Sequence, residues 1–127
     1  MKISTEDARV LTRILKHCDN VAQDLSNVRT VEELRHNDLV KRALTCSLTR
    51  IGRLVDQDLS TDLKISRTEI TWYAIIATSE ELLDSDEQDP SELWKMATSD
   101  IPELREFILK SRQEQNHFGG SGKLQLH

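Results

Sequence analysis

The chain has 127 residues, of which 37% are hydrophobic and 31% charged. That length supports one domain with a single core, and the charge content suits a helical protein with an ionic outer face. No apolar run approaches the roughly 18 residues of a membrane span, and the opening residues lack the pattern of a signal peptide. We therefore expect a cytoplasmic protein without a membrane segment.

A net charge of −5 argues against RNA or DNA binding over the whole surface, because phosphate backbones are bound by clustered Lys and Arg. The charge is unevenly distributed, however. From Arg29 to Arg53 there are six basic residues against three acidic ones, which leaves a local basic face open. The scattered His residues and the two cysteines, Cys18 and Cys46, show no metal-site spacing. We predict no cofactor, surface histidines and small buried cysteines.

The first half of the chain reads as two amphipathic helices. Apolar residues recur at three- and four-residue steps over residues 5–26, which predicts a long helix capped by Ser4. Thr30-Val31-Glu32-Glu33 has the form of a capping box, but the apolar period stops there, so it predicts only a short turn of helix. Asn37 is expected to cap a long second helix. Gly52 lies inside that helix at a cost of about 1 kcal/mol relative to alanine, which predicts close approach of a neighbouring backbone.

The second half reads as shorter helices separated by capping signals. Ser66-x-x-Glu69 predicts the start of a third helix, and Asp89-Pro90-Ser91-Glu92 the start of a short fourth one. Ser99-Asp100-Ile101-Pro102-Glu103 predicts a further start, that of the last helix. From residue 115 the apolar period ends in a glycine-rich stretch, which predicts a flexible tail over residues 115–127. The predicted fold is an all-α antiparallel helical bundle of four to five helices over residues 1–114.

Between Arg67 and Lys95 the chain carries no basic side chain, and seven acidic residues crowd into residues 79–92. We call this segment the acidic elbow, because it lies between two predicted helices. Asp84-x-Asp86 resembles the start of a calcium loop, but Asp89 stands where an EF-hand needs Gly and Lys95 where it needs Glu. A solvated acidic junction and a weak divalent-cation site remain as alternatives, and the former is favoured.

The order of the predicted helices, and the capping signals that separate them, resemble the HepT-like branch of the HEPN superfamily over roughly residues 7–109. The residues that carry this resemblance are, in chain order, Arg13-Ile14-Leu15, Lys41-Arg42-Ala43, Ile51-Gly52, Trp72, Trp94 and Ser99-Asp100-Ile101-Pro102-Glu103-Leu104. The resemblance implies a small helical homodimer. It also implies a ribonuclease toxin, usually paired with a minimal nucleotidyltransferase antitoxin, whose active motif is Arg-x4-His-x-Tyr at the end of the third helix. In such a motif, His exchanges protons and Arg stabilises the phosphate.

This chain departs from that motif at all three positions. The family pattern falls on Ser79, Asp84 and Asp86, and no Arg, His or Tyr lies between Ala74 and Trp94. Carboxylates repel an RNA backbone and are poor proton shuttles at pH 7. The family often has Glu after the mid-helix Ile-Gly, whereas this chain has Arg53, so we hypothesise that Arg53 pairs with Asp84 or Asp86.

Two functions follow from the resemblance and its departures. The first is a catalytically degenerate homodimeric binding or assembly module that holds a minimal nucleotidyltransferase and does not bind RNA. The alternative is a toxin-like ribonuclease of a toxin–antitoxin pair that uses a non-standard or metal-dependent site.

Overall fold

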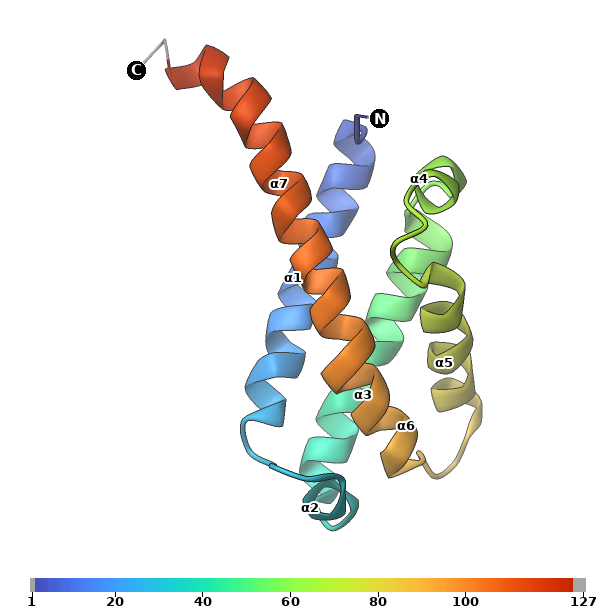
Figure 1. Ribbon diagram of the computed structural model, residues 1–127. Helices are drawn as coiled ribbons and strands as arrows, with labels where there is room; N and C mark the ends of the chain where they lie inside the picture. Colours follow the sequence, from blue (N-terminus) through green and yellow to red (C-terminus); the bar gives the residue numbers. More distant parts are fainter. Residues whose placement is uncertain (1, 125–127) are drawn as a thin grey trace.

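The protein is a helical bundle in which one helix lies at the centre. The computed structural model describes residues 2–124, with side chains described for residues 2–114, and every regular element in that range is helical. Helices α1 (Thr5–Leu25), α3 (Asp38–Arg53) and α5 (Trp72–Asp84) run antiparallel, with α3 between the other two (Figure 1). Helix α7 (Ile101–Leu124) crosses this layer and packs against α1. The predicted all-α antiparallel bundle is confirmed.

Local capping starts the first helices as the sequence predicts. Ser4 Oγ accepts a hydrogen bond from the Asp7 N–H at 3.0 Å and begins α1. Thr30 Oγ1 accepts from the Glu33 N–H at 3.1 Å, which starts the five-residue helix α2 (Val31–Arg35). Asn37 Oδ1 accepts from the Val40 N–H at 3.0 Å at the start of α3. Each side chain satisfies a backbone donor that has no partner inside its helix.

The core is built from the apolar stripes of the long helices. Trp72, at the start of α5, is almost completely buried and meets the Phe107 ring of α7 edge-on, with ring centroids 5.6 Å apart. Its indole Nε1–H donates to the Arg67 carbonyl at 2.8 Å, so the ring is buried without leaving a donor unsatisfied. The Arg67 guanidinium lies over the same Phe107 ring, 5.8 Å from its centroid. These contacts join the start of α5 to the first third of α7.

The predicted start of the third helix at Ser66 is wrong. The structure has a separate short helix there, α4 (Thr61–Ser66), and α5 begins only at Trp72. Ser66 Oγ donates to the Leu63 carbonyl instead of accepting from a following N–H. Helix α4 is capped by Ser60, whose Oγ accepts from the Leu63 N–H at 3.1 Å. In the sequence, residues 60–62 resemble a polar link between helices. The residue that fixes the start of α4 there lies on α1, far away in the chain.

That residue is Asp7, a buried carboxylate in the first turn of α1. Its Oδ1 accepts from the Ser60 N–H at 2.9 Å, and its Oδ2 from the Ser60 hydroxyl at 2.6 Å. A second buried charge holds the other side of α4. Lys64 Nζ donates to the Val55 carbonyl at 2.7 Å and to the Asp56 carbonyl at 3.3 Å. Both acceptors lie in the π-helical segment η1 (Leu54–Asp58) that ends α3, where carbonyls lack helical partners and attract a cation.

The predicted new helix start at residues 99–103 is also wrong in form. Helix α6 (Pro90–Lys95) passes through a π-helical turn, η2 (Met96–Asp100), directly into α7. Pro102 has no N–H to donate, and its ring would clash with the carbonyl four residues earlier in a regular α-helix. The wider π-turn, in which the Ile101 N–H reaches the Met96 carbonyl, accommodates the proline without breaking the helix. The predicted start of α6 is confirmed, since Asp89 Oδ1 accepts from the Ser91 N–H at 2.9 Å.

Helix α7 is described to Leu124. The predicted tail from residue 115 has no described side chains, and residues 125–127 lie outside the described range, so the boundary at residue 115 stays a prediction. Among the described helices, none combines the length and the apolar character that a membrane crossing requires.

Replacing Asp7 by alanine tests whether the α1–α4 contact stabilises the fold. Asp7→Ala removes two hydrogen bonds to an ionised acceptor, so we expect a loss of about 1.5–3 kcal/mol in the free energy of unfolding. Urea denaturation measures this. Glu6→Ala is the control, because Glu6 is exposed in the same first turn of α1 and contributes a similar charge to the helix N-terminus. Equal effects of the two substitutions would show that the Ser60 contact contributes nothing.

Candidate functional site

The structure separates the three residues that the family pattern selects. Ser79 lies inside α5 and is buried, Asp84 is the exposed last residue of α5, and Asp86 is exposed in the connection to α6. Five residues on a helix turn through about 140°, so Ser79 and Asp84 point in different directions. The positions therefore do not converge on one cleft.

Ser79 is held against Gly52 at the crossing of α3 and α5. A Cβ added to Gly52 would overlap both Oγ and Cβ of Ser79, and it would lie 3.7 Å from the Ile75 carbonyl oxygen. The Ser79 hydroxyl donates to the Ile76 carbonyl at 2.8 Å, so it is satisfied within its own helix. The close approach predicted at Gly52 is confirmed, although the nearest atoms are a side chain rather than backbone. An arginine at position 79 has no space unless α3 and α5 move apart.

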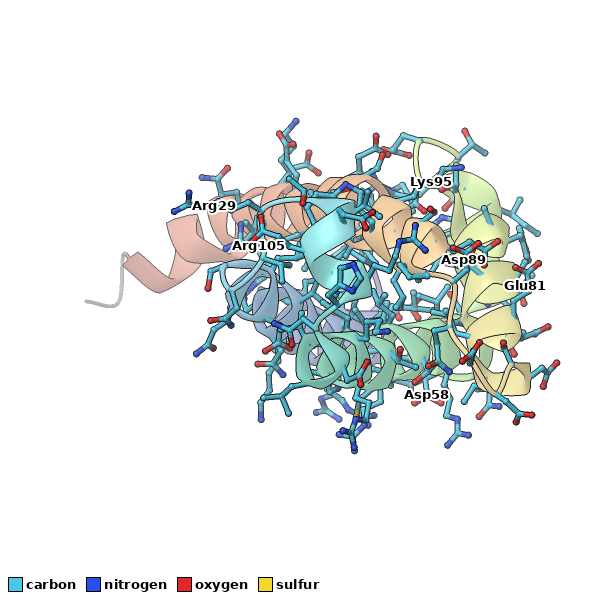
Figure 2. All side chains as sticks on the ribbon, turned by 90° about the horizontal axis from the view of Figure 1, so that it is seen from below. Arg29, Asp58, Glu81, Asp89, Lys95 and Arg105 are labelled. Atoms are coloured by element: carbon cyan, nitrogen blue, oxygen red, sulfur yellow. The ribbon has the colours of Figure 1, made fainter. Side chains whose placement is uncertain are left out.

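The acidic elbow is a region of unbalanced negative charge. None of the ion pairs among the described side chains involves residues 79–92. Burial raises the pKa of the Glu92 carboxyl. The neighbouring Glu81 raises this pKa further through its charge and a hydrogen bond, and the charge of Asp89 adds to the effect. Figure 2 labels Glu81 and Asp89 at this end of the molecule and shows oxygen-tipped side chains along the outer side of α5. Because a helix C-terminus adds partial negative charge, the elbow repels phosphates.

The described side chains do not turn the elbow into a metal site. No group of three or more His, Cys, Asp or Glu side chains gathers closely enough within the described residues to hold an ion. Arg53 is exposed at the end of α3 and takes part in none of the described ion pairs. The hypothesised pairing of Arg53 with Asp84 or Asp86 is therefore not a direct contact in this structure.

A second polar region, which the sequence did not single out, lies between α1 and α3. It is a groove of about 360 Å³, and we call it the α1–α3 groove; its lining residues are His17, Asn20, Gln23, Asp24, Ala43, Cys46, Ser47 and Arg50. Of the six basic residues from Arg29 to Arg53, the lining of this groove includes Arg50 alone. The α1 side gave no signal, because His17 is alone in the sequence and only packing places it opposite α3.

The potential at one end of the α1–α3 groove is positive. Burial lowers the pKa of the half-buried His17 imidazole, and the cations Arg50, Lys16 and Arg13 lower it further. Of these, Arg13 has an acidic partner, since its guanidinium lies 3.4 Å from the Asp58 carboxylate. Lys16 and Arg50 take part in none of the ion pairs among the described side chains. The groove therefore favours a negatively charged ligand group near His17.

The two cysteines occupy different environments. Cys18 is buried, and burial together with the Asp19 charge raises the pKa of its thiol to about 12, which leaves it unreactive. Cys46 is exposed and lines the α1–α3 groove. The interpretation of both as buried hydrophobic residues is thus confirmed for Cys18 and wrong for Cys46, because the exposed face of α3 is not covered by another helix of the described chain.

A second depression, beside α2, is lined largely by groups that already have partners. Thr30 and Asn37 line it and cap helices, and the Glu32 carboxylate pairs with Arg35 at 3.3 Å and with His36 at 3.2 Å. These interactions explain the depression as a by-product of helix capping.

No protein-family model, no curated protein and no solved structure matches this chain.

The contact between Gly52 and Ser79 can be tested by a double-mutant cycle. Gly52→Ala forces a methyl group into the space of Ser79, so we expect a loss of about 1–3 kcal/mol in the free energy of unfolding. Ser79→Gly alone costs roughly 0.5–1 kcal/mol through lower helix propensity. In combination, Ser79→Gly removes the atoms that the alanine meets, so the double variant should be more stable than Gly52→Ala. Additive losses in urea denaturation would contradict the contact.

Proposed function

We propose that this protein is a non-catalytic, HepT-like homodimeric binding module whose partner is a minimal nucleotidyltransferase. The family assignment rests on the resemblance of the residues quoted above and is consistent with the observed order of long and short helices. The nucleotidyltransferase is the partner that this resemblance implies.

The observation that carries the non-catalytic part is the burial of Ser79 against Gly52. A ribonuclease of this kind needs an arginine at that position to hold the scissile phosphate. Here the position faces the core, and α3 fills the space that a long cationic side chain would need. The other two motif positions are carboxylates at the negative end of α5, where RNA is repelled. The chemistry and the packing at these positions both oppose RNA cleavage.

The outward face of α5 is the surface that best fits the second copy of the homodimer. Its first half is apolar and exposed, with Tyr73, Ala74 and Ala77, and Tyr73 is 60% exposed. Its second half carries exposed Glu80, Glu81 and Asp84. Helix α5 lies at the edge of the helical layer, so this face is uncovered in the described structure (Figure 1). A large exposed aromatic beside small residues suits close helix–helix packing, and the acidic half gives the surface its specificity.

The absence of ribonuclease activity is tested with purified protein and a labelled single-stranded RNA. We expect no cleavage above the buffer control, and no growth arrest when the protein is overproduced alone. Asp84→Ala/Asp86→Ala should behave like the wild type in both assays, because those carboxylates have no catalytic role in this proposal. RNA cleavage that this double variant abolishes would overturn the proposal in favour of a ribonuclease with a non-standard site.

The dimer is tested by light scattering on size-separated protein. We expect a homodimer for the wild type and a shift towards monomer for Tyr73→Lys, because the lysine places a charge in the apolar half of the α5 face. Leu39→Lys is the matched control, since Leu39 is 76% exposed on α3, outside that face. A monomeric wild type, or an equal shift for both variants, would contradict a dimer formed through α5.

A further inference from the structure

We propose that the α1–α3 groove binds a phosphorylated small molecule of nucleotide size, with the phosphate held by Arg50 and His17. This site lies away from the acidic elbow and from the outward face of α5, and the inference does not depend on the proposed function.

The phosphate end is defined by cations from both helices. Arg50 comes from α3 and Lys16 from α1, and both bring positive charge to His17, which lines the groove between the two helices. Neither cation forms an ion pair with a described side chain. A guanidinium donates two parallel N–H groups to phosphate oxygens, and a neighbouring imidazole adds a third donor when protonated. A bound phosphate would supply the negative charge that these residues lack.

The rest of the groove changes from cationic to neutral to acidic. Because α1 and α3 run antiparallel, His17 shares one end with Arg50, and Asp24 shares the other with Ala43. The carboxamides of Asn20 and Gln23 lie between these ends on α1. Residues 17 and 24 are separated by about 10 Å along the helix axis at 1.5 Å per residue. That distance matches a ligand with a phosphate at one end and hydroxyl or amino donors at the other, as in a nucleoside monophosphate.

Carboxylates at both ends of the groove favour a small ligand over an RNA strand. Asp24 closes the acidic end, and Asp58, paired with Arg13, lies beyond the cationic end. A continuous phosphate backbone would have to pass both carboxylates, whereas a single phosphate meets only the cations. The net charge of −5 also opposes a long polyanion. The volume of about 360 Å³ falls in the lower part of the roughly 300–1,000 Å³ range of small-molecule sites.

Adenosine monophosphate is the first probe, measured by calorimetry and by NMR of the His17 ring. We expect saturable binding, with at least a tenfold loss of affinity in Arg50→Gln. Arg42→Gln is the matched control, because it removes an exposed arginine from the same helix outside the groove, and it should bind like the wild type. Bound phosphate favours the imidazolium in the presence of Arg13, Lys16, Arg50 and Asp24, so the NMR titration of His17 should move to higher pH. The ligand should also protect Cys46 from alkylation, while Cys18 stays unmodified throughout.

Binding of adenosine monophosphate is compared with binding of inorganic phosphate, of adenosine and of a short single-stranded RNA. Inorganic phosphate and adenosine should each bind at least tenfold more weakly than adenosine monophosphate, because each occupies only one end of the groove. Equal binding of inorganic phosphate would overturn a nucleotide-sized site. Tighter, Arg50-dependent binding of a short single-stranded RNA would overturn the small-molecule assignment. No binding of adenosine monophosphate, or an equal loss in Arg42→Gln and Arg50→Gln, would overturn the site altogether. Unchanged circular dichroism of both variants excludes unfolding as the cause.

Discussion

The close contact between Gly52 of α3 and Ser79 of α5 is the constraint on which this arrangement depends. It lets two helices approach until a serine side chain fills the space of a missing Cβ. Because α3 also packs against α1, the same central helix sets the position of the acidic elbow on one side and of the α1–α3 groove on the other. A larger residue at either position would separate α3 from α5.

This contact is also the packing observation behind the proposed lack of ribonuclease activity. Ser79, Asp84 and Asp86 differ from the Arg, His and Tyr of the proposed family's motif, and the packing of Ser79 against Gly52 leaves no space for an arginine at position 79. The elbow that follows is acidic and lies at the negative end of a helix. Cation-rich chemistry is found instead on the opposite side of α3, where His17 and Arg50 meet across a groove. The molecule thus separates its charges across one helix.

Two buried charged side chains hold the short helix α4 in place. Asp7 organises the start of α4 through Ser60, and Lys64 binds carbonyl oxygens of the segment that ends α3. Buried ionic groups are stable only when hydrogen bonds satisfy them, and both of these are satisfied by partners far away or on another element. Helix α4 therefore depends on the packing of α1 and α3 more than on its own sequence.

The local chemistry of the sequence by itself determined the helical class and the starts of α1, α2, α3 and α6. Ser4, Thr30, Asn37 and Asp89 each bind a backbone N–H two or three residues away, so their effect is readable without tertiary structure. Gly52 could be predicted as a close approach because glycine inside a helix carries a cost that needs a reason. The absence of the Arg-x4-His-x-Tyr motif was also visible in the sequence alone.

Only the tertiary structure decided the separation of α4 from α5, the continuity of α6 with α7, and the groove opposite the elbow. Ser60, the N-cap of α4, is held by hydrogen bonds to Asp7 of α1. Asp7 lies 53 positions earlier in the chain, so no local pattern predicts this contact. Pro102 widened a helix where it was expected to begin one, since its effect depends on whether packing keeps the flanking turns helical. His17 and Arg50 meet because antiparallel helices bring distant residues together, and no local pattern records which faces pair.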